Sequence, residues 1–370
     1  MIPSERSHLF ASAVTHPGMT GKNNEDRYAV SAFRLEDTAN TPSVFAMIAD
    51  GVGGHQAGEI AAEIAVNTIS HMVAISDGAK PQETLDDAIA KAGREVLAQS
   101  SKNHEQQGMG STCVCAWVIG ERLYTATVGD SRIYLLRGEK IQQISVDHTW
   151  IQEALEHGVI QPEQARNHPR SHIINRYLGS QSPAIADFRL RLSPDESKEQ
   201  AIANQGLQLL PGDQLLLCSD GLSDLVEDQE ILDALQNKTL SKALSALVEL
   251  ANQRGGHDNI TILTLKVPTP NTAPITEIEQ INSVQKTAFP WLIFAIISIA
   301  VVLVIILGAT AFWFFGRGNG TPTPTLLPEI QIPATYTVAP DEIQPSGTPL
   351  PSETPFSETL TPWPTNPPDS

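Results

Sequence analysis

The chain has 370 residues, enough for one sizeable domain with appended segments. Its 24 Lys and Arg residues against 42 Asp and Glu residues give a formal net charge of −18, which argues against nucleic acid as a partner. The three cysteines, Cys113, Cys115 and Cys218, are too few and too apolar in context for a disulfide framework, and we expect them to pack in a core.

The first predicted elements are a strand and two helices. The apolar run from Val44 to Ala49 ends at Asp50-Gly51, a pattern typical of a buried strand. Apolar residues then recur at helical spacing from Ile60 to Met72, and residues 83–100 form a second helix candidate.

Further strands are predicted in the middle of the chain. Between Ser111 and Ile144, short β-rich runs break at Gly120-Glu121 and Gly138-Glu139, which indicates hairpin turns. Another apolar run, from Gln214 to Cys218, ends at Ser219-Asp220-Gly221. Strands grouped between helices predict an α+β layered domain.

Acidic residues recur where strands end. Hard divalent cations such as Mg²⁺ or Mn²⁺ prefer oxygen ligands, and two neighbouring ions need several convergent carboxylates. A strand delivers a carboxylate to a defined place, and a following glycine permits the turn. One Asp-Gly pair alone is more often a simple turn, but five ordered segments predict a binuclear metal site. The segments are Asn24-Glu25-Asp26, Asp50-Gly51, Gly129-Asp130, Ser219-Asp220-Gly221 and Asp258-Asn259.

With their neighbours, these segments resemble in order the motifs of the metal-dependent type 2C (PPM) Ser/Thr protein phosphatases. The resemblance covers about residues 8 to 267 and is closest to the compact bacterial members. The stretch from Asp147 through Arg170 is similar to their mobile flap beside the active site. The matching motifs are Asn23-Asn24-Glu25-Asp26, residues 49–55, Gly110-Ser111-Thr112, residues 128–132, residues 219–222 and residues 256–261.

The resemblance implies a set of metal ligands and a cofactor. Asp50 is expected to bridge two ions, the Gly51 carbonyl to bind one of them, and Asp220 with Asp258 to hold the other. Asp130 matches a position that helps hold a third, weaker ion in bacterial relatives. The implied cofactor is Mn²⁺ or Mg²⁺, as two ions with a place for a third.

The resemblance also implies catalytic roles outside the ligand set. Glu25 and Asp26 are expected to act mainly through metal-bound waters. The family usually has an arginine three residues after Gly18, where this chain has Gly21, with Lys22 next to it. That arginine forks onto the substrate phosphate, whereas a lysine is a flexible point charge, so Lys22 is expected to take over only part of the contact.

The implied fold is a four-layer α-β-β-α sandwich with two central antiparallel sheets, forming a catalytic domain over residues 1–267. The implied reaction is one-step hydrolysis of phosphoserine and phosphothreonine in proteins by a hydroxide that bridges the two ions. Phosphorylated proteins and a cognate Ser/Thr kinase are the expected partners. Two alternatives remain: a pseudophosphatase that serves as a sensor or scaffold, and a specialised phosphatase of an anti-sigma-factor antagonist.

Beyond the catalytic domain, the sequence predicts a membrane anchor. Residues 268–287 are expected to form a linker, residues 288–316 one uncharged transmembrane helix, and residues 317–370 a disordered Thr/Pro-rich tail. The first 13 residues contain charges and lack the long apolar core of a signal peptide. We therefore expect a single-pass protein of the cell membrane, with a cytoplasmic catalytic domain and an extracytoplasmic tail.

Overall fold

The computed structural model describes residues 1–21, 23–52, 57–102, 104–165, 168–170, 172–270 and 279–280. Lys22, the predicted transmembrane helix and the predicted tail lie outside these residues. In the described part of the chain, no helix combines the length and the apolar character needed to cross a membrane.

The described chain alternates strands and helices. The strands are β1 Ile2–Pro3, β2 Phe10–His16, β3 Arg27–Arg34, β4 Pro42–Ala49, β5 Gly51–Val52, β6 Gly110–Ser111, β7 Cys113–Ile119, β8 Arg122–Val128, β9 Arg132–Arg137, β10 Lys140–Gln143, β11 Leu207–Gln208, β12 Gln214–Cys218, β13 Ile260–Lys266 and β14 Glu279–Gln280. The helices are α1 Gly58–Ile75, α2 Pro81–Ser100, the 3₁₀ turn η1 His104–Gln106, α3 Trp150–Glu156, α4 Pro162–Ala165, α5 Lys198–Ala203, α6 Asp220–Ser223, α7 Asp228–Asn237 and α8 Leu240–Gln253.

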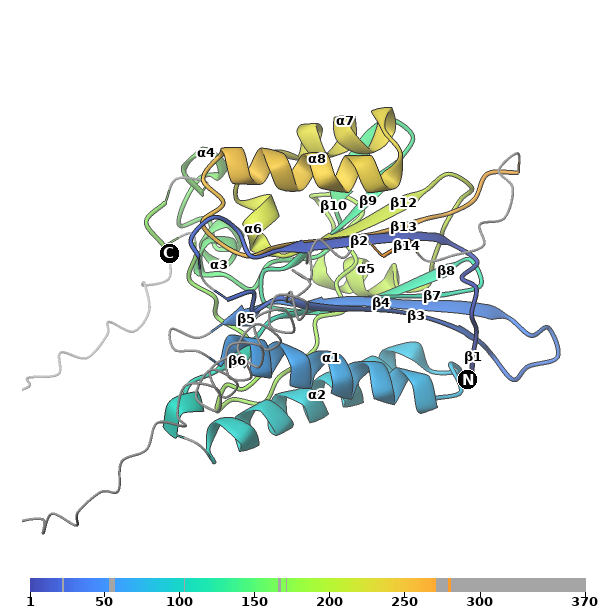
Figure 1. Ribbon diagram of the computed structural model, residues 1–370, viewed down its shortest axis with the longest axis horizontal. Helices are drawn as coiled ribbons and strands as arrows, with labels where there is room; N and C mark the ends of the chain where they lie inside the picture. Colours follow the sequence, from blue (N-terminus) through green and yellow to red (C-terminus); the bar gives the residue numbers. More distant parts are fainter. Residues whose placement is uncertain are drawn as a thin grey trace, which may run out of the picture. The chain divides into compact units, whose positions relative to one another are not determined.

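Two six-stranded sheets lie face to face at the centre of this domain (Figure 1). One has the strand order β1-β3-β4-β7-β8-β11, and the other has the order β10-β9-β12-β13-β2-β14. The described strands within them pair antiparallel except β14, which runs parallel to β2. The two predicted antiparallel sheets are thus confirmed, and the stretch predicted as linker contributes one short strand.

The predicted strand around Val44 is apolar throughout because both of its faces are covered. Side chains alternate between the two faces of a strand. Phe45 and Met47 of β4 belong to a core shared with α1 and α2, whereas Val44 and Ile48 belong to the core between the two sheets. In β12, Leu217 likewise faces the other sheet, while its neighbour Leu216 faces α7 and α8.

Helices cover the outer face of each sheet. Figure 1 shows α1 and α2 beneath the sheet that contains β4, and α7 and α8 above the sheet that contains β12. Three apolar clusters therefore separate four layers, as the α-β-β-α expectation requires. The predicted helices at 60–72 and 83–100 fall within α1 and α2, which begin two residues earlier, and α1 also ends three residues later. Both predicted hairpin turns are present, between β7 and β8 and between β9 and β10.

The cysteines have the predicted environment. Cys113 and Cys115 lie in β7, two residues apart. Both belong to the core between this sheet and the helices α1 and α2. Cys218 ends β12 in the core on the other side of the domain. All three are buried and free.

Candidate metal centre

Five carboxylates gather at one end of the sheets because of where the strands begin and end. Asp50 follows β4 and Asp26 precedes β3, its antiparallel neighbour, so both lie at the same edge. Asp220 and Asp258 stand in the same relation at the end of β12 and the start of β13. Asp130 lies in the turn that leads from β8 in one sheet to β9 in the other.

The main chain at Asp50 is held from the neighbouring segment. The amide of Thr112 donates to the Asp50 carbonyl (2.8 Å), and the Asp50 amide donates to Oγ1 of Thr112 (3.0 Å). The hydroxyl of Ser111 also donates to the Asp50 carbonyl (3.0 Å), and Gly51 pairs with Ser111 in the β5–β6 ladder. The motif Gly110-Ser111-Thr112 therefore positions the residue expected to bridge the ions.

Asp26 is bonded across the sandwich to the other sheet. It is only 2% exposed, and its Oδ2 accepts a hydrogen bond from Oγ of Ser219 (2.8 Å). The same Ser219 oxygen accepts from the amide of Thr261 (2.9 Å). Asp26 is thus held by a hydroxyl that is itself held by β13.

Asn259 connects two of the acidic segments. Its Oδ1 accepts from the amide of Glu25 (2.7 Å), and its Nδ2 donates to the carbonyls of Pro17 (3.1 Å) and Asn23 (3.2 Å). The amide of Asn259 donates to Oδ1 of Asp258 (2.8 Å). One amide side chain therefore orients both the loop that carries Glu25 and the carboxylate beside it.

The start of α1 packs directly on the acidic loops. A Cβ atom at Gly58 would overlap Oε2 of Glu25 and approach the Gly51 carbonyl carbon to 2.9 Å. A Cβ atom at Gly51 would in turn overlap the Gly58 carbonyl. Only glycine permits this approach, and the positive end of the α1 dipole favours the Glu25 carboxylate there.

Burial and repulsion by neighbouring carboxylates raise the pKa of Asp26, Asp50, Asp130 and Asp220. Burial, followed by the charges of Asp26 and Asp220, raises the pKa of Asp50 well above its usual value. Burial, followed by Asp130, does the same to the pKa of Asp220. Burial raises the pKa of Asp26 to about 6, against hydrogen bonds from hydroxyl groups that lower it. Burial and the charge of Asp147 raise the pKa of Asp130 to about 7.

These residues fit divalent cations. One buried oxygen of each of Asp26, Asp130 and Asp220 has no hydrogen-bond partner. Buried, unpartnered and mutually repelling carboxylates are costly unless a cation neutralises them. In the described chain, no three or more His, Cys, Asp or Glu side chains form a ready cage for an ion. An ion here would therefore also need oxygen ligands from the main chain and from water, as is usual for Mg²⁺.

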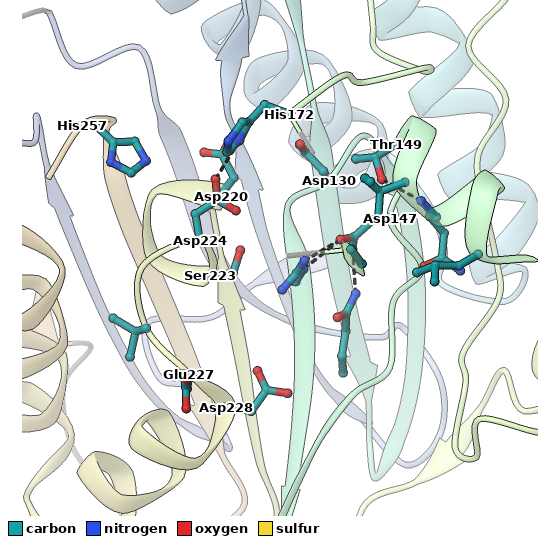
Figure 2. A pocket seen from close by; sticks show the side chains of 17 residues that line it. Asp130, Asp147, Thr149, His172, Asp220, Ser223, Asp224, Glu227, Asp228 and His257 are labelled. Carbon is teal, nitrogen blue, oxygen red and sulfur yellow. Dashed lines mark hydrogen bonds and ion pairs between the residues drawn. The ribbon is translucent and has the colours of Figure 1, made fainter. Parts of the chain in front are cut away.

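A polar pocket of about 470 Å³ adjoins this centre (Figure 2). Asp130 and Asp220 are among its lining residues, so the pocket and the carboxylate centre share residues. Asp224, Glu227 and Asp228, from the end of α6 to the start of α7, line another side. None of these three was predicted as a site residue.

The sequence of this chain matches one known protein family. The match to protein phosphatase 2C runs over residues 18–260, which include all five carboxylates described above. The chain belongs to the protein phosphatase 2C family.

Named relatives of this protein phosphatase 2C chain are bacterial. The serine/threonine protein phosphatase PstP of Mycobacterium tuberculosis is 35% identical over 259 residues, which cover 70% of this chain but only 45% of PstP. The serine/threonine phosphatase stp of Listeria monocytogenes is 34% identical over 263 residues, which cover 70% of this chain and 96% of stp. The catalytic domain of PstP in complex with two manganese ions superposes with a TM-score of 0.56 at 32% identity, covering 70% of this chain and 97% of that domain.

Gly21 occupies the position where the family resemblance implies a phosphate-binding arginine, and its backbone conformation suits glycine. In this protein phosphatase 2C chain, Gly21 has a φ of 74°, a left-handed conformation that glycine adopts easily and an arginine does not. Space around a Cβ atom there is open, so the backbone conformation, not crowding, favours glycine.

Residues of the expected flap contact Arg132 of β9 and one another. Arg132 donates from Nε (2.9 Å) and Nη2 (2.8 Å) to Oδ2 of Asp147, at the beginning of this stretch. The ring of Trp150 stacks on His168 with centroids 4.9 Å apart, and the Arg170 guanidinium lies 5.0 Å from the Trp150 ring centroid. The sequence motif indicated this stretch but not these partners.

Proposed function

We propose that this chain is a metal-dependent phosphoprotein phosphatase that hydrolyses phosphoserine and phosphothreonine at a centre for two divalent ions. The observation that carries the proposal is the gathering of five carboxylates, three of which keep a buried oxygen without a hydrogen-bond partner. The relatives named as Ser/Thr phosphatases and the two manganese ions of PstP support it.

The ligand roles follow the sequence expectation. Asp50 would be a ligand of both ions. The Gly51 carbonyl would bind one of them, and Asp220 and Asp258 would bind the other. When bound, the ions lower the pKa of water and neutralise charge on the transferred phosphoryl group. Asp130 would serve a third ion, for which its unpartnered oxygen is suited.

Ser219 and Asn259 position Asp26 and the Glu25 loop, the two acidic groups expected to act through water. Ser219 occupies one oxygen of Asp26 and leaves the other free to accept a proton or a water. The Glu25 loop is held by Asn259 and by contact with α1. Lys22 would bind the substrate phosphate as a point charge.

The test is phosphate release from phosphothreonine peptides by the full chain, with Mn²⁺ or with EDTA. We expect activity only with the ion, and Asp50→Ala should reduce the rate by several orders of magnitude. The matched control is Asp233→Asn, an exposed acid on α7 outside the pocket, which should retain the wild-type rate. Wild-type turnover by Asp50→Ala would overturn the two-ion centre.

The scaffold and anti-sigma alternatives make different predictions for the same assay. A pseudophosphatase would bind Mn²⁺ without turnover, and a specialised enzyme would reject generic peptides. The full set of acids supports ion binding, since such a cluster is costly to keep without an ion, and the relatives named as Ser/Thr phosphatases favour turnover.

We further propose that residues 288–316 anchor the chain in the cell membrane, with residues 1–267 in the cytoplasm and residues 317–370 outside. The uncharged apolar sequence supports the span, and the resemblance to phosphatases that oppose ATP-dependent kinases supports the orientation. Protease added to intact cells should trim the tail and spare the catalytic domain. Digestion of the catalytic domain with protection of the tail would reverse the orientation.

A further inference from the structure

A cavity of about 370 Å³ lies where α7 covers the sheet that contains β12. Figure 1 shows this helix above that sheet. β12 starts at the cavity with Gln214 and runs for about 13 Å to Cys218, two residues before Asp220 of the metal centre. The cavity shares none of the five carboxylates with that centre, and its volume lies within the range of small-molecule sites.

Three neighbouring strands form the floor of this cavity. Gln214 of β12 stands directly opposite Leu136 of β9 on one side and Lys266 of β13 on the other. Side chains of directly opposed residues point to the same face of a sheet. Leu136 belongs to the core shared with α7, so the side chains of Gln214 and Lys266 stand beside it on the face toward that helix.

The walls of the cavity are largely apolar. Leu232 and Leu235 of α7 line it and are each 3% exposed. Leu210, from the turn before β12, also lines it and is 45% exposed, so the apolar lining reaches the surface. The cavity can therefore cover an apolar group that enters from solvent.

The amide of Gln214 points to an occupant with a hydrogen-bond acceptor. Gln214 is 4% exposed, and its Nε2 is buried without a hydrogen-bond partner. A buried donor that lacks a partner destabilises a fold, and such groups are rare in folded proteins. Rotation about the last side-chain bond, a soft torsion, turns this N–H toward the cavity that the residue lines.

The charge beside this amide is positive. Asp213 also lines the cavity, but its carboxylate accepts from Nε (3.0 Å) and Nη2 (2.6 Å) of Arg137 and from the Leu210 amide (2.7 Å). Within the described residues, no acid forms an ion pair with Lys266. Because Arg137 and Asp213 offset each other, Lys266 leaves the cavity with a positive charge in a chain whose net charge is −18.

We propose that this cavity binds a small molecule that carries a carboxylate on a short apolar body. The carboxylate accepts from the amide of Gln214 and the ammonium group of Lys266, and the body packs against the leucines of α7. A carboxylate is favoured because it only accepts hydrogen bonds, and bonds from a charged donor are the stronger ones. The site does not depend on the proposed phosphatase function.

The experiment measures binding of three fluorinated probes to the full chain by fluorine NMR, with Mg²⁺ present. The probes are para-fluorophenylpropanoate, its primary amide and the amine of the same carbon skeleton. We expect the carboxylate to bind about tenfold more tightly than the amide, as for one charge-assisted contact, and the amine not to bind. Acetate, which has the head group without the apolar body, should not displace the carboxylate probe at equal concentration.

Two substitutions test the floor of the cavity. Gln214→Leu removes the donor, and Lys266→Met removes the charge while keeping a long unbranched side chain. Each should weaken the carboxylate probe by about tenfold and leave the amide probe of the Lys266→Met protein nearly unchanged. Lys242→Met, at an exposed position of α8 outside the cavity, is the matched control and should bind as the wild type does.

Thermal melting without probe checks that each variant folds. Gln214→Leu should keep or raise the melting temperature, because it removes a buried donor that has no partner. If this variant fails to fold, Lys266→Met alone decides the test.

Four outcomes would overturn the proposed site. They are an absence of binding by the carboxylate probe, equal binding of carboxylate and amide, wild-type affinity in Lys266→Met, and loss of the probe signal when inorganic phosphate is added. The last would place the probe at the metal centre. Activity toward phosphopeptides plays no part in any of these measurements, so failure of the phosphatase function and failure of this site are distinguishable.

Discussion

Nε2 of His148 lies 2.9 Å from Oδ2 of Asp187, and both side chains are buried. Nδ1 of His148 accepts a hydrogen bond from the Gly129 amide (3.0 Å), so the ring proton is on Nε2 and is donated to Asp187. The His148 amide also donates to the Gly129 carbonyl (2.9 Å). Asp187 thus fixes the tautomer of a histidine that holds the turn beside Asp130.

Asp187→Asn should destabilise the fold by about 2 kcal/mol at pH 7, because hydrogen bonds to a charged group are lost. Burial raises the pKa of Asp187, but hydrogen bonds from His148 and Arg189 outweigh it and leave the pKa lowered. Its stabilisation is therefore present above the unfolded value of about 3.9 and is lost as the pH falls further. Urea unfolding at pH 7 and pH 3 should show a gap between variant and wild type that narrows in acid. A gap of constant size would contradict this assignment.

The ion-free protein should lose stability as the pH rises from about 4 to about 7. Burial raises the folded pKa of Asp26 to about 6 and of Asp130 to about 7, so the stabilisation from these groups is present below their unfolded values and is lost as the pH rises through the folded ones. Mn²⁺ should therefore raise the melting temperature more at pH 7.5 than at pH 5. Thermal melting in EDTA and in Mn²⁺ at both pH values measures this, and an equal shift at the two would count against it.

Gly58→Ala should lower both stability and activity, although glycine to alanine usually favours a helix by about 1 kcal/mol. The added Cβ would overlap Oε2 of Glu25, and forcing it in should cost about 1–3 kcal/mol. Glu63→Ala, at an exposed site of the same helix, is the control. Shortening the clashing side chain with Glu25→Asp should recover part of the stability lost in Gly58→Ala. If Glu25→Asp brings no recovery, the contact with Glu25 is not the cause.

Lys22→Ala should raise KM for phosphopeptides by about tenfold, the loss of one charge-assisted contact, and Lys22→Arg should hold or lower it. The kinetics of both variants are compared with those of Lys238→Ala, an exposed lysine that follows the end of α7. Equal KM values for all three would mean that no residue replaces the absent arginine at Gly21.

The buried strands and the helices α1 and α2 were predictable because their patterns are local. The apolar run at Val44 and the helical spacing after Ile60 depend on burial that each segment shows by itself. The ordered acids could be predicted for the same reason, since each follows or precedes such a run. The site also needs residues whose role arises only in three dimensions.

Asp187 and Asp224 show what the sequence could not indicate. Asp187 lies 39 residues from His148, and nothing local marks the two as partners. Asp224 lies one helical turn after Asp220, so a prediction of α6 would have placed it near the site. A four-residue helix, however, has too little periodicity to be predicted from the sequence. The α7 and α8 helices were missed as well, although the buried residues Leu244, Leu247 and Ala251 of α8 recur at a helical spacing that the sequence itself carries.

The hydrogen bond from Ser219 to Asp26 joins residues at the ends of different sheets. Asp50 belongs to one sheet and Asp220 to the other, so an ion that both contact would act as a crosslink between them. Ion release and separation of the sheets would then be linked equilibria, each favouring the other by mass action. Substitutions that loosen the apolar layer between the sheets, far from any ligand, should therefore weaken ion affinity.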